Sequence, residues 1–438
     1  MLNRLDLRGL APAEWRTRLP RPDAGGDEPL SAVRAILEDV RTRGDAALLE
    51  LTARFDGVEL QSLRVAPDTI SAAARAADPA LAEALRAARD SIEAFHRTQR
   101  KPRARFEHNG VVIESRPVPV SRAGVYVPGG RGSYPSTVLM TAIPARVAGV
   151  EEIALCVPPD PATGEVAPSV LVAAHLAGVD ELYSIGGAQA VAAMAYGTES
   201  IASVDVIVGP GNVYVALAKR EVAGLVGVPS SFAGPSEIVV VADESTPVRF
   251  AAIDVIVQAE HGPNGLAWLI TWEPTVADAV VAEIERMVAD SPRRADIEAT
   301  FVHGGYVVLV DGPEQAIDVA NAIAPEHLQL MNAHPEVLVD RVRNAGAVFC
   351  GPWAPASVGD YIAGPSHVLP TYGTARFASA LTVDDFMKHV HVITLDRAAF
   401  DRVAPHVEVI ASVEGFSAHA DSVRLRRASF AGSGGESP

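Results

Sequence analysis

The spacing of hydrophobic residues changes near residue 110 of this chain. Before that point, apolar residues recur every three or four positions, as in "PLSAVRAILEDVRTRGDAALLELTARFDG" (29–57), which predicts amphipathic helices. From "GVVIESRPVPV" (110–120) onward, short runs rich in β-branched residues alternate with alanine-rich segments. This alternation predicts βαβ units and a parallel sheet. A second series starts at "SEIVVVAD" (236–243), so the sequence predicts at least two α/β units.

Glycine-rich turns interrupt these series where strands are expected to end. They are "VPGGRGS" (127–133), "SIGGAQA" (184–190), "VGPGNVY" (208–214) and "FAGPSE" (232–237). Ligands of open α/β sheets bind at the carboxyl ends of strands, so four such turns predict a lined cleft, although a tight turn alone would explain each one. No turn matches G-x-G-x-x-G, because Tyr214 stands where the third glycine would be, and no Walker A sequence occurs.

Composition narrows the class of protein. With 438 residues, of which 48% are hydrophobic, the chain can bury a large core. It contains no run of about 20 apolar residues, as a membrane span needs, and its first residues do not resemble a secretory signal, so we expect a cytoplasmic protein. The formal charge of −17 argues against nucleic acid as a partner. Cys156 and Cys350 lie in apolar stretches and are expected to be buried, reduced thiols, with a catalytic thiol at Cys156 as the alternative.

Two segments place titratable groups next to turn-forming residues. In "NAIAPEHLQL" (321–330), Glu326 and His327 are adjacent, which suits either a solvated turn or a catalytic acid–base pair. In "FAAIDVIVQAEHGPNG" (250–265), Gln258 and His261 are one helical turn apart near the end of a helical pattern. That spacing suits two ligands of one metal ion, although a helix C-terminus favours histidine in any case.

Further candidate ligands come from two later segments. "PASVGDYIAGPSHVLPT" (355–371) contains Asp360 and His367, and "EGFSAHAD" (414–421) contains Glu414 and His419. Gln258, His261, Asp360 and His419 together form an oxygen and nitrogen set that suits Zn²⁺ or a similar divalent ion. Spacing alone does not bring together residues from three distant segments.

Eight ordered motifs make the chain similar to one family over nearly its whole length. They are "YVPGGRGSYPSTVLM" (126–140), "IGGAQAVAAMAYGT" (185–198), "VGPGNVYVALAKR" (208–220), "AGPSE" (233–237), "QAEHGP" (258–263), "APEHLQL" (324–330), "GDYIAGPSHVLPT" (359–371) and "EGFSAHADS" (414–422). The chain resembles the histidinol dehydrogenases. The resemblance implies a zinc-dependent, NAD-linked enzyme that oxidises L-histidinol through the aldehyde to L-histidine.

The resemblance also implies roles for individual residues. One Zn²⁺ per subunit would be held by Gln258, His261, Asp360 and His419, with Ser236, His367 and Glu414 also at the substrate. His327 would be the base for the alcohol, and Glu326 the base for the water that adds to the aldehyde. The family's NAD contacts fall on Tyr126, Gln189 and Asn212.

The implied architecture is two incomplete Rossmann-like parallel-sheet domains with a small C-terminal dimerisation element. We expect an N-terminal helical arm at 1–27, a first domain from 28–125 and 237–378, and a second domain from 126–236. Residues 379–438 would contribute to the partner's site in a homodimer, with a disordered tail from about 431. Two other classes remain possible from the residues alone. One is a zinc hydrolase in which Glu326 activates water, and the other is a metabolite-binding protein without turnover.

Overall fold

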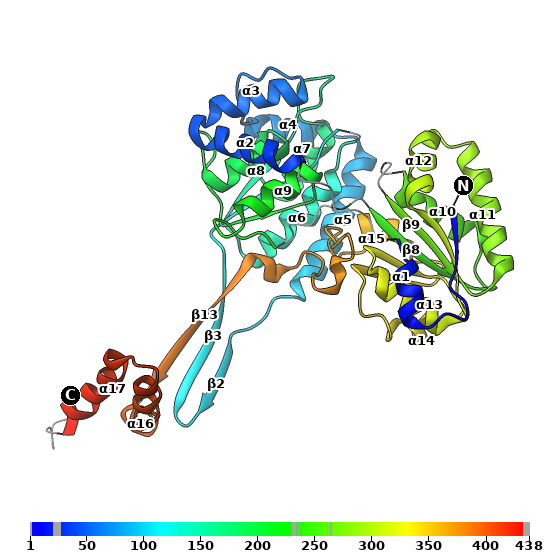
Figure 1. Ribbon diagram of the computed structural model, residues 1–438. Coiled ribbons are helices and arrows are strands. Elements are labelled where there is room, and N and C mark those ends of the chain that lie inside the picture. Colours follow the sequence, from blue (N-terminus) through cyan, green and yellow to red (C-terminus); the bar gives the residue numbers. More distant parts are fainter. Residues whose placement is uncertain are drawn as a thin grey trace. The chain divides into compact units, whose positions relative to one another are not determined.

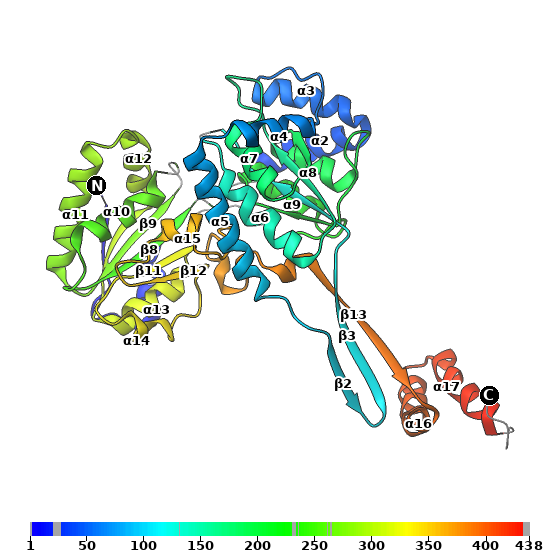
Figure 2. The same ribbon diagram turned by 180° about the vertical axis from the view of Figure 1, so that it is seen from behind.

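The structure is a computed structural model that describes residues 2–20, 28–130, 132–229, 234, 236–260, 262 and 265–431. Figures 1 and 2 show its elements from two opposite sides. The chain forms two units. The main unit consists of Met1–Arg100 and Val120–Phe386, and the small unit of Lys101–Pro119 and Met387–Pro438.

A six-stranded sheet lies in the main unit. In spatial order its strands are β1 (Asn3–Asp6), β10 (Gly305–Leu309), β9 (Leu266–Thr271), β8 (Glu237–Ala242), β11 (His327–Leu330) and β12 (Ala347–Cys350). All neighbouring strands are parallel. Every residue of β8, β9 and β11 is buried. Their continuous apolar runs are therefore those of strands covered by helices on both faces.

Alternate residues of β8 point into two separate cores. Ile238 and Val240 pack with the first core, which contains residues of α10 (Val248–Ala259), α11 (Pro274–Ala289) and α12 (Arg294–Gly304). Val239 and Val241 pack with the second core, which contains residues of α1 (Pro12–Arg18), α13 (Pro313–Ile323) and α14 (Pro335–Val339). Figure 1 shows these two helix groups on opposite sides of the sheet, as the two-residue period of a strand requires.

A four-stranded parallel sheet also lies in the main unit. Its spatial order is β6 (Glu181–Ser184), β5 (Glu152–Val157), β4 (Arg122–Tyr126) and β7 (Val206–Val208). The chain adds β5 and β6 on one side of β4 and then places β7 on its other side. The direction of winding therefore reverses between β4 and β7. In open α/β sheets such a reversal opens a crevice at the carboxyl ends of the strands.

In the described part of the chain, eight helices accompany the four-stranded sheet. One core joins its strands to residues of α2 (Glu28–Arg43), α3 (Asp45–Asp56), α8 (Gly187–Tyr196) and α9 (Val213–Val222). The other four are α4 (Pro67–Ala76), α5 (Pro79–Arg97), α6 (Pro135–Ala148) and α7 (Pro168–Leu176). Of these, α4 contacts α7 and α5 contacts α6. The main unit also contains α15 (Ala356–Tyr361) and the short 3-10 helices η1 (Thr374–Arg376) and η2 (Val383–Phe386).

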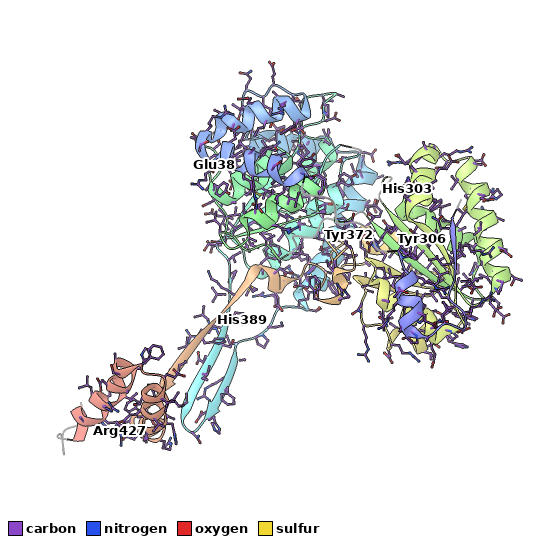
Figure 3. All side chains as sticks on the ribbon, viewed as in Figure 1. Glu38, His303, Tyr306, Tyr372, His389 and Arg427 are labelled. Atoms are coloured by element: carbon purple, nitrogen blue, oxygen red, sulfur yellow. The ribbon has the colours of Figure 1, made fainter. Side chains whose placement is uncertain are left out.

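The small unit is built on an antiparallel sheet of three strands. Its order is β13 (Met387–Leu395), β3 (Val111–Pro119) and β2 (Ala104–His108), and Figure 3 labels His389 on β13. The helices α16 (Arg397–Val413) and α17 (Ser417–Ala431) follow. No residue of β2, β3 or β13 is fully buried. This sheet therefore provides little core of its own.

The predicted fold class is confirmed. Several elements, however, join a different sheet from the one that the expected domain borders assigned them to. The start of the 1–27 arm is a strand, because β1 pairs with β10 at the edge of the six-stranded sheet. Helix α2 contacts α8 and α9, so it accompanies the four-stranded sheet rather than the strands of 237–378. The strand pattern at 110–120 forms β3, which pairs antiparallel with β13. Hydrophobic periodicity predicts the type of an element, but its partner depends on contacts distant in sequence. The domain borders as a whole stay a prediction.

Three of the four glycine turns lie where they were predicted. The turns at 127–133, 184–190 and 208–214 follow β4, β6 and β7. The prediction is wrong for 232–237, because Glu237 begins β8 and the motif therefore precedes this strand. Residues 232, 233 and 235 of the motif lie outside the described residues. Among the described residues, no helix has both the length and the apolar character required to cross a membrane.

Candidate active site

Glu326 and His327 lie at the amino end of β11, inside the protein. Glu326 directly precedes the strand and His327 is its first residue. Only 8% of Glu326 and 3% of His327 is exposed. Burial of two titratable groups costs free energy unless partners compensate it. The solvated-turn interpretation is therefore excluded, and the partners of the pair become the question.

The backbone of Glu237 orients both members of the pair. Parallel pairing of β11 with β8 sets His327 opposite Ile238, so Glu237 lies next to the pair although it is 89 residues from Glu326. The Glu237 N–H donates to Glu326 Oε2 over 2.9 Å, and His327 Nδ1 lies 3.1 Å from the Glu237 carbonyl oxygen. A carbonyl oxygen can only accept, so this contact favours a proton on Nδ1.

Two more side chains surround the imidazole of His327. Its Nε2 lies 3.0 Å from Oδ1 of Asp360 on α15, and Nε2 of Gln258, on the last turn of α10, lies 3.4 Å from its Nδ1. Burial alone would lower the pKa of His327, but the charge of Glu326 and the hydrogen bond to Asp360 outweigh it and raise the pKa to about 10. With this pKa the ring is an imidazolium at neutral pH, between two acceptors.

Glu237 also places a buried carboxyl group close to the pair. Its side chain is almost fully buried, and its Oε1 accepts a hydrogen bond of 3.1 Å from the N–H of Tyr372, which is labelled in Figure 3. Within the described part of the chain, Oε2 has no hydrogen-bond partner. Burial and the neighbouring charge of Glu326 raise the pKa of Glu237 to about 8, so this group is mostly neutral at pH 7.

His367 uses both ring nitrogens within the protein. Nδ1 lies 2.8 Å from the backbone carbonyl oxygen of Asp360, so it must carry the proton. Nε2 lies 3.0 Å from Thr137 Oγ1 on α6 and accepts from that hydroxyl group. Burial lowers the pKa of His367, which agrees with a neutral ring. His367 therefore fixes the end of α15, which carries Asp360.

The donor set tests whether a metal ion fits here. The Oε1 of Gln258 is buried and has no hydrogen-bond partner among the residues that the structure describes, and such an oxygen is a ready ligand. The carboxylate of Asp360 lies across His327 from Gln258. Amide and carboxylate oxygens are ligand types that a divalent ion accepts, but these two lie on opposite sides of the imidazole ring. Among the described residues, no three His, Cys, Asp or Glu side chains form a metal cluster by themselves.

The other two predicted ligands are His261 and His419. His261 lies outside the described residues, and α10 ends at Ala259. The expectation that Gln258 and His261 share a helix face stays a prediction, because His261 is not described. Glu414 and His419 are exposed residues of the small unit, and the His419 ring lies 5.3 Å from that of Phe416. Ser236 is half-buried directly before β8.

The predicted cofactor residues line one cavity. Tyr126, Gln189 and Asn212 lie on the wall of a cavity of about 1190 Å³, and each follows or ends a strand of the four-stranded sheet. Asn212 caps α9, because its Oδ1 accepts from the N–H groups of Tyr214 and Val215 over 3.0 and 3.2 Å. The Tyr126 hydroxyl oxygen accepts from the Gly187 N–H over 3.1 Å. The cavity thus lies at the crevice that the winding of this sheet predicts.

Gly209 holds the turn after β7 against β4. Its φ is +110°, and a Cβ atom at this position would overlap the carbonyl oxygen of Tyr126. Lys219, which is buried on α9, donates a hydrogen bond to the Gly209 carbonyl. Sequence analysis missed Lys219 and Glu237. For Glu237 a signal existed, because an acid that opens the apolar run "EIVVVA" must be buried with it.

The two cysteines differ in burial. Cys156 is fully buried, and burial raises the pKa of its thiol, so the alternative of a catalytic thiolate is not supported. Cys350 is exposed, and the expectation of a buried thiol is wrong for it. It ends β12, which is the edge strand of the six-stranded sheet, so no further strand covers it.

The main unit contains two wound parallel sheets. One carries a buried acid–base pair, and the other has a crevice where its winding reverses. These features define the class of α/β enzymes with Rossmann-like sheets. The family model for histidinol dehydrogenase matches residues 19–427. The chain belongs to the histidinol dehydrogenase family.

Individual relatives align with this chain along nearly their whole length. The chain is 50% identical to a histidinol dehydrogenase of Synechococcus sp. over 404 residues, which is 91% of this chain and 92% of that protein. It is 48% identical to one of Thermosynechococcus vestitus over 94% of this chain and 96% of that protein. The crystal structure of histidinol dehydrogenase from Elizabethkingia anophelis superposes with a TM-score of 0.92 at 33% identity, covering 98% of both chains.

The Gly209 turn gives a stability prediction. Gly209→Ala should lower the free energy of unfolding by about 3 kcal/mol, because the new Cβ meets backbone and the φ is strained. Gly178→Ala is the matched control. Gly178 also has positive φ, +67°, but a Cβ there meets nothing within 4 Å, so it should lose only about 1 kcal/mol. Urea unfolding measures both, and equal losses would contradict the steric role of Gly209.

Proposed function

We propose that this protein is a zinc-dependent histidinol dehydrogenase of the cytoplasm. It would oxidise L-histidinol with NAD through L-histidinal to L-histidine, the last steps of histidine biosynthesis. The observation that carries the proposal is the buried pair Glu326 and His327, because each step of this reaction needs a base. Membership of the histidinol dehydrogenase family supports the choice of substrate.

The chemistry requires two different proton transfers. Oxidation of the alcohol removes one hydride from carbon and one proton from oxygen. The aldehyde must then add water, which loses a proton to a base, before a second hydride can leave. Over both steps, two NAD and one water give two NADH and three protons. Two adjacent bases that point to different atoms suit two sequential steps.

His327 is the proposed base for the alcohol. Burial lowers the pKa of His327, but Glu326 and Asp360 together raise it. A cation bound by Asp360 would offset that negative charge, so the neutral imidazole would be populated at lower pH. The Glu237 carbonyl at 3.1 Å from Nδ1 would keep the ring oriented, with Nε2 as the atom that accepts the proton.

Glu326 is the proposed base for the water. Its Oε2 accepts the Glu237 N–H over 2.9 Å, which fixes the carboxylate and leaves the other oxygen to accept a proton from water. Glu237 itself is too strongly buried to replace it, because its carboxyl group is mostly neutral at pH 7. The two buried glutamates would therefore have different tasks.

Zn²⁺ would be held by Gln258, His261, Asp360 and His419, and would orient the substrate's amine and imidazole as a Lewis acid. The unpartnered Oε1 of Gln258 supports this assignment. Ser236, His367 and Glu414, together with these ligands and the catalytic pair, would contact the substrate. For His367 this requires Nε2 to exchange Thr137 for a substrate donor.

NAD would occupy the cavity lined by Tyr126, Gln189 and Asn212 and would accept each hydride at its nicotinamide ring. The position of this cavity at the winding reversal of the four-stranded sheet supports the assignment. Glycines 129, 130 and 187 also line the cavity and let a nucleotide approach the backbone.

A homodimer with shared sites would supply Glu414 and His419 from the partner chain. The small unit exposes large apolar side chains around these two residues, namely Val409, Ile410, Val413, Phe416 and Leu425. Such exposure is typical of a protein–protein interface. Since the unit also provides little core of its own, a second copy of the chain is the proposed partner.

The function predicts a specific assay result. Protein with zinc, L-histidinol and NAD should produce two NADH per histidinol and L-histidine, followed at 340 nm and by chromatography. Chelation should abolish this turnover and zinc should restore it. Histidinol binding without NADH would favour a binding protein, and hydrolysis without NADH would favour a hydrolase. Full activity in a verified metal-free sample would rule out the zinc assignment.

The division of labour predicts that two variants fail at different steps. In a single turnover with excess NAD, Glu326→Gln should form one NADH per site quickly and the second very slowly, because the amide keeps the shape but lacks basicity. His327→Ala should be slow from the start. With histidinal supplied directly, Glu326→Gln should stay impaired and His327→Ala much less so. Equal loss of both steps in both variants would indicate one coupled unit instead.

Shared sites predict complementation. His327→Ala and His419→Ala should each be inactive as homodimers. Co-refolded heterodimers should regain activity, because one of their two sites would contain both native residues. Activity and native mass spectrometry measure the outcome, with each variant refolded alone as the control. Heterodimers confirmed by mass but inactive would mean that each chain builds its own site.

A further inference from the structure

The cavity proposed for NAD contains an acid that sequence analysis did not single out. Asp56 is the last residue of α3, and it lines the same cavity as Tyr126, Gln189 and Asn212. It lies outside the four-stranded sheet in a helix that packs against α8. The inference drawn from it rests on the proposed function, because it concerns how NAD is recognised.

One oxygen of the Asp56 carboxylate has no hydrogen-bond partner among the described residues. Its Oδ2 is buried, and no donor in the described ranges makes a hydrogen bond to it. Burial raises the pKa of Asp56 to about 6, as expected for a carboxylate that is desolvated without compensation. A buried acceptor left unpaired costs free energy, so a ligand with hydroxyl or amine donors, which Oδ2 would meet by rotation of the carboxylate, would stabilise this site.

The other two acids on the cavity wall already have cationic partners. Asp39 is held by both Nε and Nη2 of Arg43, over 2.6 and 2.7 Å. Glu38, which Figure 3 labels, has Arg41 at 3.8 Å. Among the lining residues that the structure describes, Asp56 is thus the carboxylate that has no ion pair.

The sheet itself does not provide the acid that this kind of fold normally uses. In dinucleotide-binding sheets, an acid at the end of the second strand binds the ribose hydroxyls of NAD. Here β5 is the second strand, and it is followed by Pro158 and Pro159, which line the cavity. The next residue is Asp160. Its Oδ1 already accepts a hydrogen bond from the Ala162 N–H over 2.8 Å, so this oxygen has a partner within the protein.

We propose that Asp56 accepts hydrogen bonds from the adenosine ribose hydroxyls of NAD and selects NAD over NADP. A vicinal diol offers two O–H donors to one carboxylate. In NADP a phosphate dianion replaces one of these donors, so the same carboxylate would repel it. Helix α3 thus takes over the role that the end of the second strand has in other Rossmann sheets.

Arg54 makes the selection testable in both directions. It lines the same cavity, and its guanidinium lies over the Phe55 ring, 5.1 Å from the centroid. Once the charge of Asp56 is removed, Arg54 remains as a cation that can meet a 2′-phosphate. Removal of Asp56 should therefore weaken NAD and strengthen NADP at the same time.

The experiment measures cofactor dissociation constants by calorimetry on the full-length, zinc-loaded protein without substrate. Asp56→Asn should raise the Kd for NAD by about tenfold to a hundredfold, as for loss of a charged hydrogen-bond partner. It should lower the Kd for NADP. Asp68→Asn is the control, because Asp68 is an exposed acid in the first turn of α4 and is not part of the cavity wall. It should leave both constants unchanged.

A second measurement does not depend on any variant. NAD that carries 2′-deoxyadenosine should bind the unmodified protein about tenfold or more weakly than NAD, and Asp56→Asn should no longer distinguish the two. If Asp56 only positions Tyr126, the variant would weaken both cofactors equally and keep the preference for the 2′-hydroxyl. That result would overturn the proposal.

The failure of this proposal is distinguishable from failure of the proposed function. If the unmodified protein binds NAD and Asn212→Ala weakens it while Asp56→Asn does not, NAD is the cofactor and Asp56 does not read its ribose. If the unmodified protein binds no NAD at all, the proposed function itself is wrong. A thermal melt of each variant verifies that the compared samples are folded.

Discussion

The parallel pairing of β8 with β11 is the constraint on which the candidate active site depends. It brings the amino ends of two strands together, so that one residue, Glu237, offers its N–H to Glu326 and its carbonyl to His327. Both contacts come from backbone, which cannot change rotamer. The orientation of the acid–base pair therefore follows from the register of the sheet, and a slip by one residue would turn both side chains to the other face.

The two proposed sites lie at opposite ends of the strands of their sheets. The cavity proposed for the cofactor lies at the carboxyl ends of β4 and β7, as the winding of the four-stranded sheet requires. The acid–base pair instead lies at the amino ends of β8 and β11. At the amino end of a parallel strand, the first N–H groups are free to bind a carboxylate. This explains how a buried Glu326 finds a donor.

Sequence patterns predicted those features that depend on residues close together in the chain. The βαβ alternation, the three glycine turns after β4, β6 and β7, and the adjacency of Glu326 and His327 could be read from neighbouring residues. Features that depend on contacts between residues distant in sequence could not be predicted in this way. No pattern in residues 3–6 shows that β1 pairs with β10, or that β3 joins β13 rather than a parallel sheet. The environment of Glu326 is also non-local, because it is set by a residue 89 positions away.

Asp360 connects the proposed catalytic pair, Glu326 and His327, to the metal site proposed here. Its Oδ1 accepts from His327 over 3.0 Å, and a carboxylate has about four lone-pair sites on its two oxygens. It can therefore accept this hydrogen bond from the protonated ring and still bind a cation through its other lone pairs. His367 holds the backbone of the same residue through a bond of 2.8 Å, so the position of Asp360 is fixed before any ligand arrives. Preorganisation of this kind keeps the acceptor next to His327 whether or not the cation is bound.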